Sequence, residues 1–197
     1  MRGVKPPRYP TLWEACVNVI VFQQISLLAA SSIMRRLIVS LDPPLDSDGV
    51  SLHTFPTIER FMAADDYVLR AAGLSSGKRS TLHRVAEALQ AGALNEAMLE
   101  KRASPDAAAL LCGIKGIGPW TATVILLRGL GRLDVFPMND TSVVRNLALV
   151  SSSDRIDVDD LLGTLSPQQG MLYYHLLLAR LEARGELGRA SRSPEIE

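Results

Sequence analysis

Apolar residues recur every three or four positions along most of the chain, which is the spacing of one buried face of an α-helix. The first such stretch covers about residues 11–22 and places Leu12, Cys16 and Val19 on one face. A second stretch, at about 26–40, keeps the same spacing. No segment shows a convincing strand alternation and no segment repeats, so the pattern predicts an all-α fold.

Residues that cap helices divide the remainder of the chain into shorter helices. Ser, Thr, Asp and Asn favour the position before a helix, whereas glycine favours the position after its end. Candidate N-caps are Ser26, Asp65 or Asp66, Asn95, Ser104, Asp157 and Ser166. Ser166 is followed three residues later by Gln169, which is the spacing of a capping box. The predicted further helices are at about 57–64, 65–73, 75–90, 95–101, from 104 onward, 120–130, 141–147, 157–165 and from 166 to about 185.

Three segments lack this helical pattern. Pro, Asp and Gly gather at 42–54 and predict a loop. Residues 1–10 contain Pro and Arg and predict an irregular segment, and residues 186–197 predict a frayed terminus. We therefore expect one domain at 11–185.

The composition bounds the class of protein. A chain of 197 residues with 47% hydrophobic content can build a sizeable core. It has 21 basic and 21 acidic residues, and this zero net charge counts mildly against a nucleic-acid partner without excluding one. Its two cysteines and the lack of a signal peptide favour a reducing compartment, the cytoplasm or nucleus, and no apolar run is long enough for a membrane.

A glycine-rich stretch at about 110–124 is the strongest local signal. Gly113, Gly116 and Gly118 precede Pro119, and the apolar spacing of a new helix follows. Glycine gives a tight turn and lets another molecule approach the backbone, and Pro fits a first helical turn. Backbone amides at such a helix N-terminus can bind a phosphate. A plain connector between two helices would show the same pattern.

One carboxylate is placed to act beside this turn. Asp140 follows a loop that contains Pro137 and precedes the helical pattern at 141–147. It can serve as an N-cap, or as a catalytic group whose ionised form is favoured by the helix dipole. These two interpretations are compatible. We interpret Asp134 as structural, and Asn139 as a residue that helps to hold the loop.

Several of these segments together resemble the helix–hairpin–helix (HhH-GPD) DNA glycosylase superfamily, and within it the 3-methyladenine DNA glycosylase II branch. The matching segments cover about residues 8–185 and are Gln23–Ser26, Phe55–Thr57, Ala72–Ser75 with Lys78, Ile114–Ala122, Leu127–Gly129, Asp134–Phe136 and Asp140. The resemblance implies two helical lobes with the active-site cleft between them. It also implies an enzyme that flips a damaged base out of double-stranded DNA and cleaves its N-glycosidic bond.

The resemblance assigns roles to individual residues. It makes Asp140 the catalytic carboxylate and Gln24 the side chain that fills the gap left by the extruded base. The DNA-binding residues that it implies are Gln24, Lys78, Lys115, Gly116, Ile117, Gly118 and Thr121. The substrate-pocket residues are Phe22, Trp120, Val124, Tyr174 and Leu177. The main-chain carbonyls that would hold a structural Na⁺ or K⁺ are those of Cys112, Ile114 and Ile117. The basic groups that we expect near DNA are Lys78, Arg79, Lys115 and Arg132.

Trp120 implies which reaction the enzyme performs. Members of the superfamily that also nick the strand carry a lysine nucleophile at this position, and an indole cannot form a Schiff base. The resemblance therefore implies a monofunctional enzyme that leaves an abasic site. An indole face would also stack on a cationic alkylated purine. The alternative is that Trp120 is simply a core residue.

Val124 and Leu177 are aliphatic where this branch often has aromatic residues, although Tyr173, Tyr174, Phe22 and Trp13 can compensate. This departure keeps open a glycosylase of the same fold for hypoxanthine or uracil, and also a non-catalytic DNA-binding module. No cysteine follows Cys112, so we expect no iron–sulfur cluster and no catalytic cofactor. The chain begins almost at the first helix, so we expect the β-rich N-terminal domain of some members to be absent or removed. The family usually acts as a monomer.

Overall fold

A computed structural model describes residues 5–47, 50–138, 140, 143, 146–147 and 157–185. Within these ranges helices dominate, and the all-α fold is confirmed. The expected frayed tail at 186–197, Asn139 and most of the expected helix at 141–147 lie outside the described residues. The described helices are α1 Leu12–Phe22, α2 Leu27–Leu41, α3 Ile58–Met62, α4 Asp66–Ala71, α5 Ser76–Gln90, α6 Glu96–Glu100, α7 Ser104–Cys112, α8 Pro119–Gly129, α10 Val158–Leu165 and α11 Gln169–Ala183.

Side-chain caps explain why most helices begin where the sequence predicts. The cap oxygen accepts a hydrogen bond from an amide of the first turn and satisfies one of the donors that a helix N-terminus leaves unpaired. The N-caps that do this are Thr11, Ser26, Thr57, Asp65, Ser75, Asn95 and Asp157.

Two predicted N-caps are wrong, because each serine occupies a different helix position and makes a different hydrogen bond. Ser104 is the first residue of α7 rather than its cap, and its buried hydroxyl donates to Asp134 Oδ2 at 2.6 Å. Ser166 closes α10, and its amide donates to the carbonyl of Gly163 at 3.3 Å. Helix α11 begins three residues later, at Gln169, so no capping box forms.

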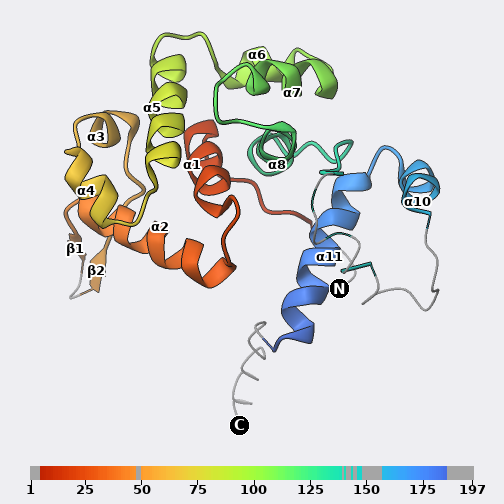
Figure 1. Cartoon of the computed structure of the whole chain (residues 1–197), viewed down its shortest axis with the longest axis horizontal. Coiled ribbons are helices and arrows are strands. Elements are labelled where there is room, and N and C mark those ends of the chain that lie inside the picture. Colours follow the sequence, from red (N-terminus) through yellow and green to blue (C-terminus); the bar gives the residue numbers. More distant parts are fainter. Residues whose placement is uncertain are drawn as a thin grey trace.

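The expected loop at 42–54 is also partly wrong. Strands β1 Leu45–Ser47 and β2 Val50–Leu52 pair in an antiparallel register that places Leu45 opposite Leu52. Each strand has only three residues, which is too short for an alternating pattern to stand out in the sequence. This hairpin lies at the end of α2, at the far left of Figure 1.

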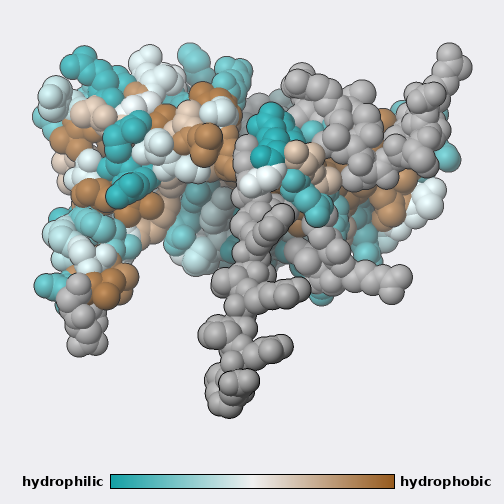
Figure 2. All heavy atoms as spheres, turned by 90° about the horizontal axis from the view of Figure 1, so that it is seen from below, coloured by the Kyte–Doolittle hydropathy of each residue, from teal (hydrophilic) through white to brown (hydrophobic). Residues whose placement is uncertain are grey.

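The face of the molecule in Figure 2 mixes apolar and hydrophilic side chains, and Leu28 of α2 is 73% exposed.

The main core forms where α1, α5, α7 and α8 pack together (Figure 1). A Cβ on Gly129 of α8 would lie 2.9 Å from the Cβ of Ala15, so α1 and α8 pack closely there. A smaller cluster of Val143, Leu147 and Leu176 lies beside α10 and α11. Tyr173 packs against both clusters, so the two lobes meet at this residue. In the described ranges, no helix combines the length and apolarity that crossing a membrane requires.

The loop from α8 toward residue 140 is fixed at two points. The amide of Gly170 donates to the carbonyl of Leu133 at 2.7 Å, and a Cβ on Gly170 would lie 3.2 Å from the backbone of Leu133. The next residue, Asp134, accepts the hydrogen bond from Ser104. This contact gives Asp134 a role within the protein, which agrees with its structural interpretation.

The hairpin between α7 and α8 depends on one left-handed residue. Gly113 is right-handed, with φ −62°, and Gly118 is extended at the N-cap of α8, whereas Gly116 has φ +104°. A Cβ on Gly116 would lie 1.9 Å from Thr81 Oγ1 of α5. Both its backbone conformation and its packing therefore require glycine here.

We expect Gly116→Ala to lower the free energy of unfolding by about 2 kcal/mol or more, because the substitution adds a strained φ and a clash with Thr81. Urea denaturation would measure this. Gly77→Ala is the matched control, since Gly77 is helical and a Cβ there meets nothing within 4 Å. Equal destabilisation by both substitutions would contradict the analysis.

Candidate active site

Asp140 lies between two helices that each supply a hydrogen-bond donor to it. Trp120, in the first turn of α8, donates from Nε1 to Asp140 Oδ2 at 2.9 Å. Tyr173 of α11 donates from its hydroxyl to the same oxygen at 2.7 Å. Hydrogen bonds to a charged acceptor are stronger than neutral ones, so this pair fixes the orientation of the carboxylate.

The surroundings keep Tyr173 protonated. Burial raises the pKa of Tyr173, and the neighbouring Asp140 carboxylate raises it further. Phe136 packs against the phenol ring at a centroid distance of 6.0 Å and an interplanar angle of 85°. The phenol is therefore a neutral donor held in a partly apolar site.

Three of the expected pocket residues lie on the helices that supply the donors to Asp140, and their role in a substrate pocket stays a prediction. Val124 follows Trp120 by one turn of α8, and Leu177 follows Tyr173 by one turn of α11, so each pair shares a helix face. Trp120, Val124 and Leu177 are buried or half-buried.

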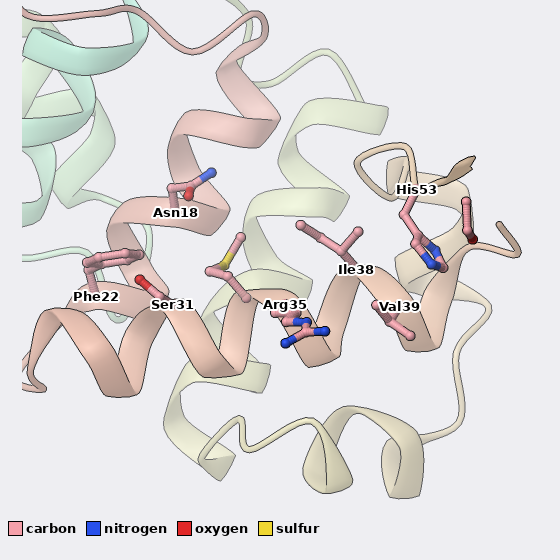
Figure 3. Close-up of a pocket in the computed structure, with 9 residues that line it drawn as sticks. Asn18, Phe22, Ser31, Arg35, Ile38, Val39 and His53 are labelled. Atoms are coloured by element: carbon pink, nitrogen blue, oxygen red, sulfur yellow. The ribbon is translucent and has the colours of Figure 1, made fainter. Parts of the chain in front are cut away.

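The structure places the other two expected pocket residues in different surroundings. The guanidinium of Arg128 lies over the ring of Tyr174, 5.8 Å from its centroid. Phe22 lines a cavity of about 660 Å³ between α1, α2 and β2. In Figure 3, Phe22 and Ser31 lie at one end of this cavity, and Val39 and His53 lie at the other.

Gln24 has a strained backbone in the turn between α1 and α2. Its φ is +57°, and among the described residues no other non-glycine has a positive φ. Its side chain is exposed. Strain of this kind costs about 1–3 kcal/mol and tends to occur at functional sites. An exposed side chain on a fixed turn is what insertion into a duplex requires.

The ammonium of Lys78 holds the end of α1. Nζ donates to the carbonyls of Val21 at 2.7 Å and Gln23 at 3.0 Å. A cation is favourable at a helix C-terminus, and α1 has no basic residue in its own last turn. Burial lowers the pKa of Lys78. The proposed contact of Lys78 with DNA stays a prediction, and the structure adds this role within the protein.

The N-terminus of α8 has the features of a phosphate site. Gly118 caps the helix without a side chain, and Pro119 follows it, so the next amides have no intrahelical acceptor. Lys115 and Gly116 are exposed in the turn, whereas Ile117 and the side chain of Thr121 are buried. Any contact of Thr121 with a phosphate would therefore use its amide.

Arg79 and Arg132, which we expected near DNA, make contacts within the protein. Arg79 forms an ion pair with Asp66 at 2.6 Å and donates to the carbonyl of Leu74. Arg132 donates to carbonyls at the end of α6 and to the hydroxyl of Ser104. These bonds give both guanidinium groups a structural role, and their contact with DNA remains a prediction.

The carbonyls expected to hold a cation lie where α7 ends. Cys112 is the last residue of α7, so its carbonyl lies beyond the helical hydrogen bonds. The carbonyl of Ile114 accepts the amide of Ile117 at 3.0 Å and keeps a second lone pair. Neutral oxygen donors fit Na⁺ or K⁺. In the described residues, no group of three His, Cys, Asp or Glu side chains is placed to hold a metal ion.

Three contacts at the site were not assigned from the sequence. The first is the hydrogen bond from Tyr173 to Asp140. The sequence could suggest Tyr173 as a site residue, because it precedes the expected pocket residue Leu177 by one helical turn. The other two join distant segments and leave no local signal. Gln23 Nε2 donates to Thr121 Oγ1 at 2.7 Å, and Arg84 Nη1 donates to the carbonyl of Lys115 at 3.1 Å.

Comparison with known proteins shows the family of this chain. The chain belongs to the HhH-GPD superfamily of base excision DNA repair proteins, whose family model matches residues 17–163. It is 27% identical to the DNA-3-methyladenine glycosylase of Bacillus subtilis over 80% of this chain and 52% of that protein. It is 28% identical to the alkylbase DNA glycosidase-like protein mag2 of Schizosaccharomyces pombe over 88% of this chain and 81% of that one.

The chain spans about half the length, or less, of the first curated relatives that it matches. Among solved structures, a DNA-3-methyladenine glycosidase from Bacillus halodurans is 29% identical, with a TM-score of 0.70 over 92% of this chain and 81% of that one. The Schizosaccharomyces pombe enzyme Mag1, solved with abasic DNA, shares the fold at 23% identity, with a TM-score of 0.70 over 93% of this chain and 85% of that one.

The raised pKa of Tyr173, caused first by burial and then by the neighbouring Asp140, predicts an alkaline loss of stability. Because the pKa of Tyr173 is raised on folding, the unfolded chain releases a proton above about pH 10 that the folded protein keeps. The free energy of unfolding then falls by up to about 1.4 kcal/mol per pH unit for this group. Tyr173→Phe removes this component.

Urea denaturation between about pH 9 and pH 11 would compare the slopes of the two proteins. Burial also raises the pKa of Tyr9, but that residue is present in both. Parallel pH profiles would contradict the assignment.

Proposed function

We propose that this protein is a monofunctional DNA glycosylase that excises alkylated purines such as 3-methyladenine from double-stranded DNA. The observation that carries the proposal is the Asp140 carboxylate, held by Trp120 and Tyr173 beside the helix that follows the glycine-rich hairpin. The named relatives support the alkylated substrate. The enzyme acts as a monomer where the DNA lies, in the bacterial nucleoid or the nucleus.

DNA contact begins at the hairpin. Amides at the N-terminus of α8 and in the turn at 116–118 bind a backbone phosphate, with Lys115 adding charge. The carbonyls of Cys112, Ile114 and Ile117 hold a Na⁺ or K⁺ ion that bridges to the phosphate and has no catalytic role. The damaged nucleotide is extruded at a cost of a few kcal/mol, and Gln24 fills the gap.

Asp140 acts on the sugar. Breaking the bond between C1′ and the base places positive charge on the sugar, as in other glycoside cleavage, and a fixed carboxylate stabilises that charge. The same carboxylate orients the water that adds to C1′. Its two hydrogen bonds hold it in place before the reaction, so little reorganisation is needed in the transition state.

Trp120 explains both the substrate and the product. Its half-buried indole provides an aromatic wall on which a cationic alkylated base stacks, which contributes about 0.5–2 kcal/mol. The position holds no amine, so no Schiff base forms with C1′ and the strand stays intact. The products are the free base and an abasic site.

The first test is release of bases from methylated duplex DNA by the wild type and by Asp140→Asn. We expect the wild type to release 3-methyladenine, with strand breaks only after hot alkali. Asp140→Asn should bind the DNA and lose turnover, because a neutral amide cannot balance the sugar charge. Substrates containing hypoxanthine or uracil are run alongside.

Each outcome of this test distinguishes between functions. Release of hypoxanthine or uracil alone would replace the alkylpurine assignment. Strand breaks without alkali would show lyase activity. No release of any base, with DNA binding unchanged in Asp140→Asn, would leave a DNA-binding module.

The donors to Asp140 give a second test. Trp120→Phe and Tyr173→Phe each remove one hydrogen bond to a charged group, so we expect single-turnover excision to slow by about tenfold or more. Tyr9→Phe is the matched control, because Tyr9 packs under Arg128 at the other end of α8. Equal rates in all three variants would show that orientation of Asp140 does not limit the reaction.

A further inference from the structure

The turn that carries Gln24 is fixed by hydrogen bonds to α5 and to the hairpin between α7 and α8. Gln23 ends α1, Ser26 caps α2, and Gln24 between them has the unfavourable φ of +57°. A strained residue keeps its conformation only where its surroundings hold it. Two side chains do so here, namely Lys78 of α5 and Gln23 itself.

Gln23 connects this turn to the hairpin at two points, one in α8 and one in the turn between α7 and α8. Its Nε2 donates to Thr121 Oγ1, in the first turn of α8, at 2.7 Å. The same nitrogen lies 3.4 Å from the carbonyl of Gly116, the left-handed residue of the turn. Thr121 is 3% exposed, so this hydrogen bond is shielded from water. One amide group thus joins segments 98 residues apart in the sequence.

Lys78 restricts the movement of the turn between α1 and α2. It binds the carbonyl of Gln23, and Gln23 binds the hairpin, so the turn is held from two sides. The side chain of Gln24 is left exposed. A displacement of the hairpin is therefore transmitted to the backbone of Gln24.

We propose that Gln23 is a positioning residue that couples the hairpin's grip on the DNA backbone to the insertion of Gln24 into the duplex. This inference rests on the proposed function. In it, Gln23 does not touch the reacting atoms, and it acts through Gln24.

A double-mutant cycle tests the coupling. Single-turnover excision is measured for the wild type, Gln23→Ala, Gln24→Ala and the double variant, on duplex DNA with one 3-methyladenine or hypoxanthine. We expect Gln23→Ala to slow excision by about tenfold in the wild type and by less than about twofold when Gln24 is already Ala, because coupled residues are not additive. Losses that simply multiply would overturn the proposal.

The partner Thr121 gives an independent arm of the test. Thr121→Val removes the acceptor at nearly constant volume and should reproduce the Gln23→Ala defect, whereas Thr121→Ser keeps the hydroxyl and should restore activity. This arm remains decisive if Gln23→Ala unfolds. Gln90→Ala removes an exposed glutamine at the end of α5 and should leave the rate unchanged.

Base extrusion is followed separately from excision, in the Asp140→Asn background. A 2-aminopurine beside the target base brightens when that base leaves the stack. We expect Gln23→Ala to reduce this signal while DNA affinity changes by less than about threefold. If the wild type excises nothing, the glycosylase proposal fails, yet this signal still tests the coupling. An unchanged signal in an active enzyme would overturn the coupling alone.

Discussion

The hydrogen bonds that Trp120 and Tyr173 donate to Asp140 Oδ2 connect helices from the two hydrophobic clusters of this protein. Trp120 comes from a helix of the main core, and Tyr173 packs against both hydrophobic clusters. The carboxylate therefore receives hydrogen bonds from two helices, α8 and α11, in addition to the backbone bonds of its own loop. A half-buried polar contact of this kind is most favourable when its donors are correctly placed, so the packing of α8 and α11 contributes to the geometry at the site.

Helix packing explains why the hairpin can serve as a rigid support. Gly116 lies against Thr81, and Thr121 lies beneath Gln23, so the turn between α7 and α8 is held by α5 on one side and by the end of α1 on the other. The amides at the N-terminus of α8 keep a fixed direction as a result. Preorganised donors of this kind lose little entropy when they meet an anion.

The sequence predicts the helices well, because caps and apolar spacing are local. It does not predict the two strands, which have only three residues each. It also wrongly predicts Ser104 and Ser166 as N-caps, because Ser104 bonds to Asp134 and Ser166 closes α10, and no local pattern shows either contact. Asp140 and Trp120 are conspicuous beside the glycine-rich turn, and the structure brings them together. The sequence does not show that Tyr173 rather than Tyr174 contacts Asp140. Neighbouring residues on a helix point about 100° apart, and only the packing of α11 decides which one faces the site.

The loop that leads to Asp140 also has consequences for how the chain can change. Leu133 accepts a hydrogen bond from Gly170, and Asp134 accepts one from Ser104. Asp140 follows six residues after Asp134. One inserted residue adds up to about 3.3 Å of chain, which is more than the tolerance of a hydrogen bond. This stretch therefore has a fixed length, because one residue more or fewer between Asp134 and Asp140 would move the carboxylate away from Trp120 and Tyr173. Relatives that keep these two donors should also keep the spacing between Asp134 and Asp140.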